Sequence, residues 1–392
     1  MNKISFPTIL LCAIISFISC KEKYLEVEIT DETGVELGTR VVELPAQDIL
    51  GQLNSSGFYI IDDKGKEIPS QLTHDSLILF ACNVHVGETK KFRILKSDSI
   101  HSYKATVSGA FYPKRRDDLS YENELVGFRI YGPATQQAGE KAYGYDIFFK
   151  YPTEELIVPQ LYEAQTSDTN WAKADSLRKI DKELADKFIN SFTYHIDHGK
   201  GMDCYAVGPT LGAGVTAIFQ NDSIIYPWCY ESAEILDNGP LRFTAKLKFP
   251  TSFENITEGL TEYRILSLDS YSFLNDCRLW YEGLNTPVEI VSGFPLRDNS
   301  APFVDKAKGI LAYADPTQGN NNGKALLGLV TQKQADSVIF KDNHILLANQ
   351  INPADTFKYK WGFTWDKTEI PTMEEWQDYL NISNLKYTVR IK

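Results

Sequence analysis

Two short stretches of the chain carry the residue types that proton transfer needs. The first, residues 194–214, reads YHIDHGKGMDCYAVGPTLGAG and contains His195, His198, Asp203 and Tyr205. Histidine titrates near neutral pH, and a neighbouring carboxylate or tyrosine can complete an acid/base pair. Glycines after His198 permit a sharp turn, so His198, Asp203 and Tyr205 could converge on one pocket. The stretch is either an acid/base site or a polar turn whose histidines bind backbone carbonyls.

A transition-metal site is disfavoured in this stretch. If residues 191–197 form a strand that continues to His198, side-chain alternation points His195 and His198 to opposite faces, and they cannot chelate one ion. A zinc site would also need a third ligand at a suitable spacing, and the sequence signals none. We expect no cofactor, although a bound calcium ion would be compatible with the chemistry described below.

The second stretch, residues 112–134, reads YPKRRDDLSYENELVGFRIYGPA. A guanidinium binds a carboxylate through two parallel hydrogen bonds, so Arg129 could hold a uronic acid, with Asn123 and Glu122 beside it. Tyr131 shares a strand face with Arg129. The charged run offers an alternative, because its members could pair with one another on the surface: Arg115, Arg116, Asp117 and Asp118.

Composition restricts the class of ligand. The 392 residues carry a net charge of −12 with scattered cations, which argues against nucleic-acid binding. Aromatic residues make up 12% of the chain, and flat rings suit stacking against sugars, although most of them must pack the core. The candidate substrate-binding residues are Arg115, Arg116, Tyr131, Trp228 and Tyr194.

The N-terminus resembles a bacterial lipoprotein signal. Residues 1–19 combine Lys3 with an apolar run too short to span a bilayer comfortably, and Cys20 follows Ser19. We expect cleavage before Cys20 and lipidation of that thiol, which anchors a protein of the Gram-negative envelope on its periplasmic or cell-surface side. An ordinary signal peptide or a buried strand is the alternative. Four other cysteines would then remain, either as single buried thiols or with one disulfide, such as Cys204 with Cys229: Cys82, Cys204, Cys229 and Cys277.

Short alternating strands dominate the rest of the chain. They predict a small β-sandwich over residues 20–104 and a large antiparallel β-supersandwich domain over residues 105–392. Residues 174–191 have the apolar stripe of one amphipathic surface helix. Thr372 with Glu375 forms the pattern of a helix-capping box.

Four motifs together resemble the domain-of-unknown-function (DUF) 4861 family: RRDDLSYENELVGFRIYGPA, GYDIFF, HIDHGKGMDCYAVGPTLGAG and LDNGPLRF. Tyr121 stands where the family usually has tryptophan. The resemblance implies a secreted protein or lipoprotein of polysaccharide-degrading bacteria, found beside lyases and hydrolases, and it brings no assigned catalytic residues. The strand at Asn238–Phe243 is also similar to one in galactose-mutarotase-like supersandwich proteins.

These observations lead to a leading prediction, a lyase that cleaves uronic-acid-containing glycans by β-elimination. His198 and Tyr205 would transfer protons, Arg129 and Asn123 would neutralise the carboxylate, and Glu122 and Asp203 would orient these groups. The alternatives are a non-catalytic glycan-binding lipoprotein, and a glycoside hydrolase or epimerase that uses a His/carboxylate pair. We expect a monomer that meets the membrane only through its lipid.

Overall fold

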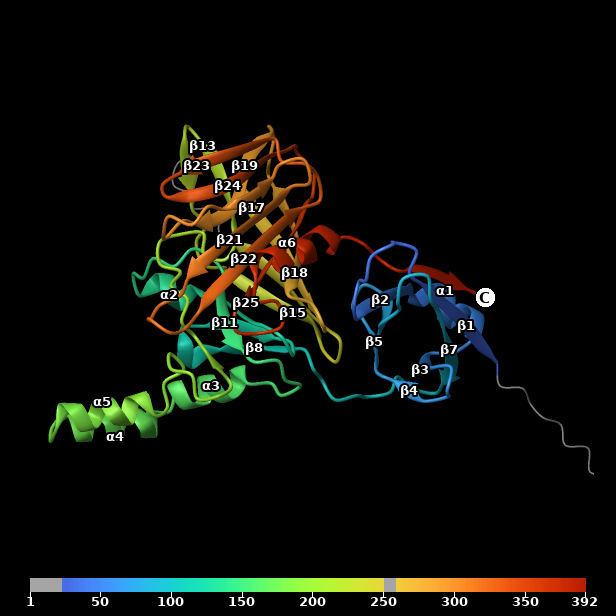
Figure 1. Ribbon diagram of the computed structural model, residues 1–392, viewed down its shortest axis with the longest axis horizontal. Helices are drawn as coiled ribbons and strands as arrows, with labels where there is room; N and C mark the ends of the chain where they lie inside the picture. The colour runs from blue at the N-terminus through green and yellow to red at the C-terminus, as the bar shows by residue number, and fades with distance from the viewer. Residues whose placement is uncertain (1–22, 250–258) are drawn as a thin grey trace, which may run out of the picture.

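The computed structural model describes residues 23–249 and 259–392, which form two β-rich domains (Figure 1). The expectation of a mostly β protein with a sandwich, a larger supersandwich and few helices is confirmed. The expected signal sequence and Cys20 lie outside the described residues. Within those residues, no helix is long and apolar enough to cross a membrane.

The smaller domain is a sandwich of two antiparallel sheets. One sheet has the order β26-β1-β7-β3-β4 and the other β2-β6-β5. Alternate residues such as Val27, Leu44 and Phe80 are buried between them. The elements are β1 (Tyr24–Thr30), β2 (Arg40–Pro45), α1 (Ala46–Leu53), β3 (Gly57–Ile61), β4 (Glu67–Ile68), β5 (Ser70–Leu72), β6 (Leu77–Cys82), β7 (Thr89–Ser97) and β26 (Thr388–Ile391).

The C-terminal strand belongs to this smaller domain. β26 pairs antiparallel with β1, with Val27 opposite Ile391. The expected division at residue 105 leaves out this return of the chain to the first domain at its end. This pairing joins residues more than 350 positions apart, and such non-local contacts leave no local pattern in a sequence.

The larger domain contains an eight-stranded sheet and two five-stranded sheets among the described residues. All three contribute to one hydrophobic core, in which Phe128, Val291 and Trp361 come from different sheets. The first sheet is β15 (Ser232–Asn238), β16 (Arg242–Phe249), β17 (Thr261–Asp269), β18 (Leu274–Glu282), β25 (Phe357–Trp365), β22 (Lys324–Thr331), β21 (Ile310–Pro316) and β20 (Phe303–Asp305). The second is β14 (Ser223–Ile225), β13 (Thr216–Gln220), β19 (Val288–Pro295), β24 (His344–Ile351) and β23 (Ser337–Lys341). The third is β12 (Gly201–Met202), β11 (Asp146–Lys150), β10 (Gly127–Ile130), β9 (Asp118–Glu122) and β8 (Ser108–Tyr112).

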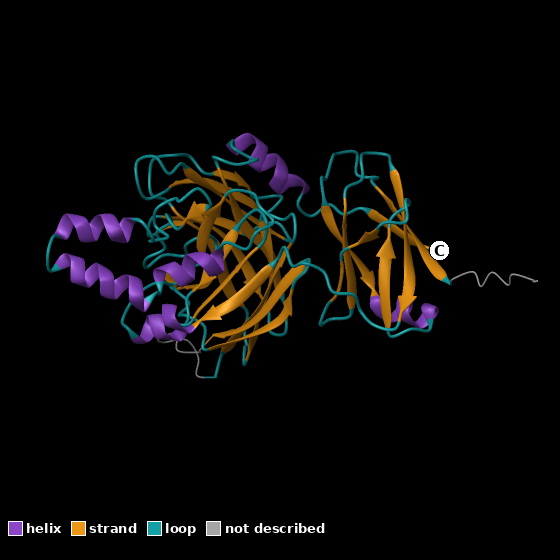
Figure 2. Cartoon of the chain, turned by 90° about the horizontal axis from the view of Figure 1, so that it is seen from below, coloured by secondary structure: helices purple, strands orange, loops and turns teal. Residues whose placement is uncertain are grey.

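The helices lie at the periphery of the larger domain (Figure 2). They are α2 (Pro133–Gln137), α3 (Val158–Gln165), α4 (Asp168–Arg178), α5 (Lys182–Asn190) and α6 (Met373–Ile382), with a 3-10 turn at Pro113–Arg115. The single helix expected over 174–191 is wrong: α4 ends at Arg178, and Asp181 caps a new helix by accepting from Glu183 and Leu184. Ile180, assigned to the apolar stripe, is 80% exposed in the break. The capping box of Thr372 and Glu375 is confirmed at the start of α6.

The four cysteines among the described residues are free and buried, so the disulfide considered between Cys204 and Cys229 does not form. Burial raises the pKa of each thiol to about 12, since desolvation disfavours the thiolate: Cys82, Cys204, Cys229 and Cys277. Thiols protonated at neutral pH are poor nucleophiles, and we assign them a packing role.

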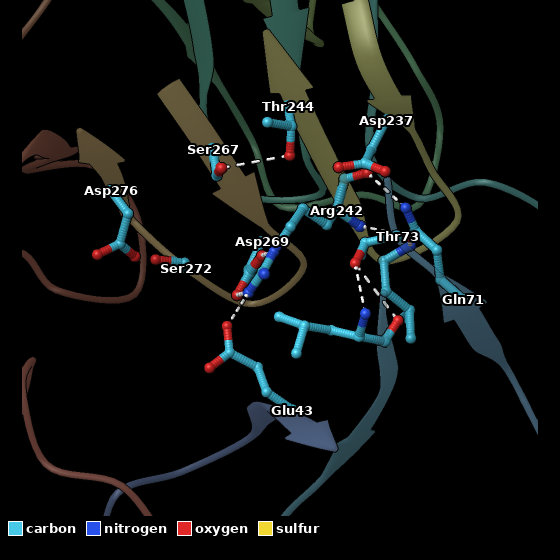
Figure 3. Close-up of polar contacts among 12 residues, drawn as sticks. Glu43, Gln71, Thr73, Asp237, Arg242, Thr244, Ser267, Asp269, Ser272 and Asp276 are labelled. Carbon is cyan, nitrogen blue, oxygen red and sulfur yellow. Dashed lines mark hydrogen bonds and ion pairs between the residues drawn. The ribbon is translucent and has the colours of Figure 1, made fainter. Parts of the chain in front are cut away.

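A polar clamp joins the two domains (Figure 3). The Gln71 side chain of β5 accepts from the backbone N–H groups of Leu241 and Arg242, at 2.8 Å each, and donates to the Arg242 carbonyl at 3.0 Å. The Arg242 guanidinium bridges Glu43 of β2, at 2.8 Å, and Asp269 of β17, also at 2.8 Å. Gln71 of the smaller domain thus binds backbone groups of the larger domain, and Arg242 of the larger domain binds the Glu43 carboxylate of the smaller one.

Replacing Gln71 with leucine is expected to loosen this clamp. The change leaves the Leu241 and Arg242 N–H groups without an acceptor, and each unsatisfied buried group costs about 1–3 kcal/mol. We expect urea denaturation to show a free energy of unfolding lower by about 2–4 kcal/mol, with faster proteolysis between the domains. Gln52→Leu, at an exposed position on α1, is the matched control. Equal stability of the Gln71 and Gln52 variants would contradict this role.

Candidate functional site

A buried arginine surrounded by carboxylates lies on one face of the third sheet. Arg129 of β10 binds Asp146 of β11 through Nε, at 2.7 Å, and through Nη2. The two residues are opposite each other in the β10–β11 register. Asp203, just after β12, places Oδ2 3.2 Å from Nη2, and Asp118 of β9 places Oδ2 3.9 Å from Nε. Neighbouring strands thus position three carboxylates around one guanidinium.

Three tyrosine hydroxyls complete what we call the Arg129 cluster. Tyr131 donates to Asp146 Oδ2 at 2.6 Å, and Tyr162 donates to Asp118 Oδ2 at 3.2 Å. The hydroxyl of Tyr194 accepts from Arg129 Nη1 at 3.2 Å. The Arg129 cluster comprises Asp118, Arg129, Tyr131, Asp146, Tyr162, Tyr194 and Asp203.

Burial holds the pKa values of two carboxyl groups in this cluster above their usual range. Burial raises the pKa of Asp203 to about 6, and the Arg129 charge opposes the rise only in part. Asp118 behaves alike, with burial raising its pKa to about 6. Asp203 Oδ2 has no hydrogen bond, despite its distance to Arg129. A carboxyl group with such a pKa can exchange a proton at physiological pH.

His195 connects the Arg129 cluster to solvent. Its Nδ1 lies 3.0 Å from the Asp203 carbonyl oxygen and 3.8 Å from Asp203 Oδ2, while 52% of its side chain is exposed. A carbonyl oxygen only accepts, so Nδ1 carries the proton in the neutral ring and the lone pair lies on Nε2. Nε2 has no partner among the described residues. The unprotonated nitrogen of the imidazole is therefore open to solvent, and the Asp203 carboxylate lies beside the ring.

Arg115 provides a second cation at the same place. Its Nε donates to the Tyr194 hydroxyl at 2.8 Å, and the His195 ring lies edge-on to the Tyr194 ring, with centroids 4.7 Å apart. Both Arg115 and His195 lower the pKa of Asp203. The terminal nitrogens of Arg115 have no partner in the described part of the chain, and the side chain is half-buried. They remain able to bind an anion.

Comparison with known proteins assigns the family. The model of a domain of unknown function (DUF4861) matches residues 29–391, nearly the whole chain. The chain belongs to the DUF4861 family. This confirms the resemblance carried by the four motifs, three of which supply Arg129, Asp146, His195 and Asp203.

Relatives of this DUF4861 protein include an uncharacterized protein P7 of Formosa agariphila, 24% identical over 319 residues, which cover 78% of this chain and 74% of the relative. Two solved structures from Enterococcus faecalis are similar over 94% of this chain. One is described as a protein in glycosyl hydrolase family 38 (TM-score 0.48, 8% identity) and the other as an alpha-mannosidase (TM-score 0.46, 9% identity). The match spans 47% and 46% of those chains, about half their length.

The DUF4861 fold brings together some of the residues predicted from sequence. Residues 191–197 form turns and not the expected strand, so the alternation argument that separated the two histidines fails. His198 is exposed, and its Nε2 bonds to the Thr193 carbonyl at 3.0 Å. The histidine beside Asp203 is His195, whereas the sequence pattern favours His198 for the proton transfer.

The motif around Asn123 has buried partners of its own. Asn123 donates to the carbonyls of Asp269 and Ser272, at 2.7 Å each. Glu122 pairs with Lys150 at 2.6 Å in the core. These bonds make both residues structural, and neither is free to bind a uronic acid.

The remaining predicted binding residues have separate surroundings. Arg129 is saturated by Asp146, so it positions the cluster and does not bind ligand. Arg116 is exposed and forms an ion pair with Glu140. Trp228 lies edge-on to Tyr143, with centroids 6.1 Å apart. Within the described ranges 23–249 and 259–392, no group of three His, Cys, Asp or Glu side chains is arranged to hold a metal ion.

Tyr205 belongs to a neighbouring polar group that sequence reasoning missed. The Arg297 guanidinium lies over its ring, 5.4 Å from the centroid, and binds Asp315 Oδ2 through Nε at 3.1 Å. Burial and the Asp315 charge raise the pKa of Tyr205 well above its usual value. Burial also raises the pKa of Asp315 to about 7, against the opposing charge of Arg297. Asp315 and Arg297 stand in no recognisable motif, which is why only the fold reveals them.

The Asp315→Asn variant should flatten the pH dependence of stability. A native pKa of about 7 lies above the ordinary unfolded value of about 3.9, so the native state binds more protons between these values. Stability from this group is therefore present at low pH and lost as pH rises through about 7, with a slope of at most about 1.4 kcal/mol per pH unit. Urea denaturation at several pH values measures it. Asp222→Asn, at a side chain 81% exposed, should keep the parent slope; the same slope in Asp315→Asn would refute the assignment.

Proposed function

We propose that this protein is an exported enzyme of complex-carbohydrate breakdown, which cleaves uronic-acid-containing glycans by β-elimination with His195 as the base. The observation that carries the proposal is the half-exposed imidazole with a free Nε2, held through Nδ1 by the Asp203 carbonyl. The carbohydrate class rests on the association that the family resemblance implies. Export rests on the lipoprotein signal ending at Cys20.

The proposed chemistry needs a base, an acid and a cation. His195 Nε2 takes the proton from C5 of the uronic acid, the C4–O bond breaks and a C4=C5 double bond forms. The imidazolium returns the proton to the departing oxygen, so the ring ends the cycle neutral. Arg115 binds the substrate carboxylate and stabilises the negative charge that develops on it. Asp203 and Arg129 are positioning residues, because they act on the substrate only through His195 and Tyr194.

Incubation of the purified protein with a panel of uronic-acid glycans tests the proposal. Rising ultraviolet absorbance of the unsaturated product supports β-elimination. New reducing ends without absorbance would instead favour the glycoside hydrolase with a His/carboxylate pair, and an inverted sugar configuration without chain cleavage would favour the epimerase. Binding without turnover would favour a glycan-binding lipoprotein.

Arg115→Gln provides the matched test of carboxylate binding. Without the cation, KM for an acidic glycan should rise and kcat should fall, because the charge that develops on the carboxylate is no longer neutralised. Lys114→Gln removes an exposed neighbouring charge that pairs with Asp168, and it should have little effect. Equal kinetics of the two variants would contradict the role of Arg115.

A further inference from the structure

A second candidate site lies between the two domains, away from the Arg129 cluster. A cavity of about 1060 Å³ opens where residues 35–40 of the sandwich meet the β17–β18 turn and α6. This exceeds the usual volume of a small-molecule site, about 300–1,000 Å³, and leaves space for more than one sugar ring. Its aromatic and apolar lining includes Leu37, Leu125, Tyr271, Phe273, Ile370 and Tyr379.

Tyr271 presents its ring to this cavity from a strained backbone. Its φ is +63°, which is unusual for an aromatic residue, and its side chain lies in the cavity wall with 42% of the residue exposed. Such conformations persist only where the surroundings enforce them, and they gather at ligand-binding positions. An exposed aromatic residue in the cavity wall offers a flat face for a ligand.

The motif around Asn123 enforces that conformation. The Glu124 carboxylate accepts from the Tyr271 N–H and from the Ser270 hydroxyl, the latter at 3.0 Å. The Asn123 side chain also holds the turn by donating to the Asp269 and Ser272 carbonyls. Asn123, first considered for the acid/base site, thus serves with Glu124 to build this turn.

The cavity also holds donors and acceptors without partners. Arg40 reaches the Tyr379 hydroxyl only at 3.5 Å, and its Nε and Nη2 have no hydrogen-bond partner. Arg40 forms no ion pair among the described residues. Asp378 and Glu369 line the same cavity and have no hydrogen-bond or ion-pair partner there. A ligand that both donates and accepts through hydroxyl groups fits this set.

We propose that this interdomain groove binds an uncharged saccharide, with Tyr271 stacked on a sugar ring and the groove's carboxylates accepting from hydroxyl groups. The charge balance argues against an acidic sugar, since the cavity lining holds one cationic residue, Arg40, and six carboxylic residues: Glu36, Glu124, Glu154, Glu369, Glu375 and Asp378. An anion would meet their summed repulsion. The site holds a neutral part of a polysaccharide and is independent of the proposed elimination reaction.

Titration calorimetry with neutral oligosaccharides, and with acidic ones of equal length, tests the proposal. The parent protein should bind a neutral oligosaccharide, and Tyr271→Gly should weaken that binding at least tenfold. Glycine adopts positive φ without strain, so this variant should melt at no lower temperature than the parent. Tyr24→Ala, at a tyrosine that is 47% exposed on the sandwich, is the matched control and should bind normally.

His195→Ala should bind the neutral oligosaccharide as the parent does, which separates this site from the acid/base site. Three results would overturn the proposal. They are no binding of any neutral oligosaccharide by the parent, unchanged affinity in Tyr271→Gly, and equal or tighter binding of acidic oligosaccharides.

Discussion

Replacing Arg129 with methionine is expected to lower the free energy of unfolding by about 3–5 kcal/mol, as measured by urea denaturation at pH 7.5. The guanidinium lies within 4 Å of Asp118, Asp146 and Asp203. Removing it leaves these buried carboxyl groups without a compensating charge. The loss should shrink at lower pH, because protonation then removes the uncompensated charges.

Arg116→Met is the matched control, since it removes an exposed arginine that pairs with Glu140. Exposed pairs contribute about 0–1 kcal/mol, so this variant should stay near the parent. The double variant Arg129→Met with Asp146→Leu should recover part of the stability, because one uncompensated charge is gone. A loss below about 1 kcal/mol in Arg129→Met would show that the cluster is not held by this cation.

The second large effect concerns catalysis. His195→Ala should lower kcat on a uronic-acid glycan about 10²–10⁴-fold, which is the range for a general base. His198 lies three residues further along the chain, and its imidazole is also exposed. The His198→Ala variant should therefore leave kcat within about twofold of the parent. His198 holds Nε2 on the Thr193 carbonyl at 3.0 Å and, unlike His195, forms no ion pair with a carboxylate among the described residues. Loss of activity in His198→Ala with full activity in His195→Ala would reverse the assignment.

The sequence predicts the fold class because strand alternation is a local property. In β16, for example, Ala245, Leu247 and Phe249 are buried, and Lys246 and Lys248 between them are only partly buried. The family also follows from the order of the four motifs. The break between α4 and α5 is not predicted from the sequence, because the apolar stripe continues through Ile180. Asp181 nevertheless caps a new helix there. The pairing of β26 with β1 is not predicted from the sequence, because it depends on non-local contacts.

The candidate site is only partly predictable for a related reason. Arg129, Tyr131, Tyr194 and Asp203 stand in the motifs, and the structure brings them together. The choice of His198 over His195 rested on the glycines that follow His198, but the turns of this segment place His195 beside Asp203. Asp146 is visible in GYDIFF, but its position opposite Arg129 needs the β10–β11 register. Asn123 and Glu124 sit next to the arginine strand in sequence and yet build the Tyr271 turn.

Mass spectrometry of the products from a uronic-acid glycan tests the central claim most directly. The proposed elimination predicts new non-reducing ends that are unsaturated and one water lighter than hydrolysis products. These ends should form with the parent protein and with His198→Ala, but not with His195→Ala. Saturated products one water heavier, or no products from any glycan of the panel, would contradict β-elimination by His195.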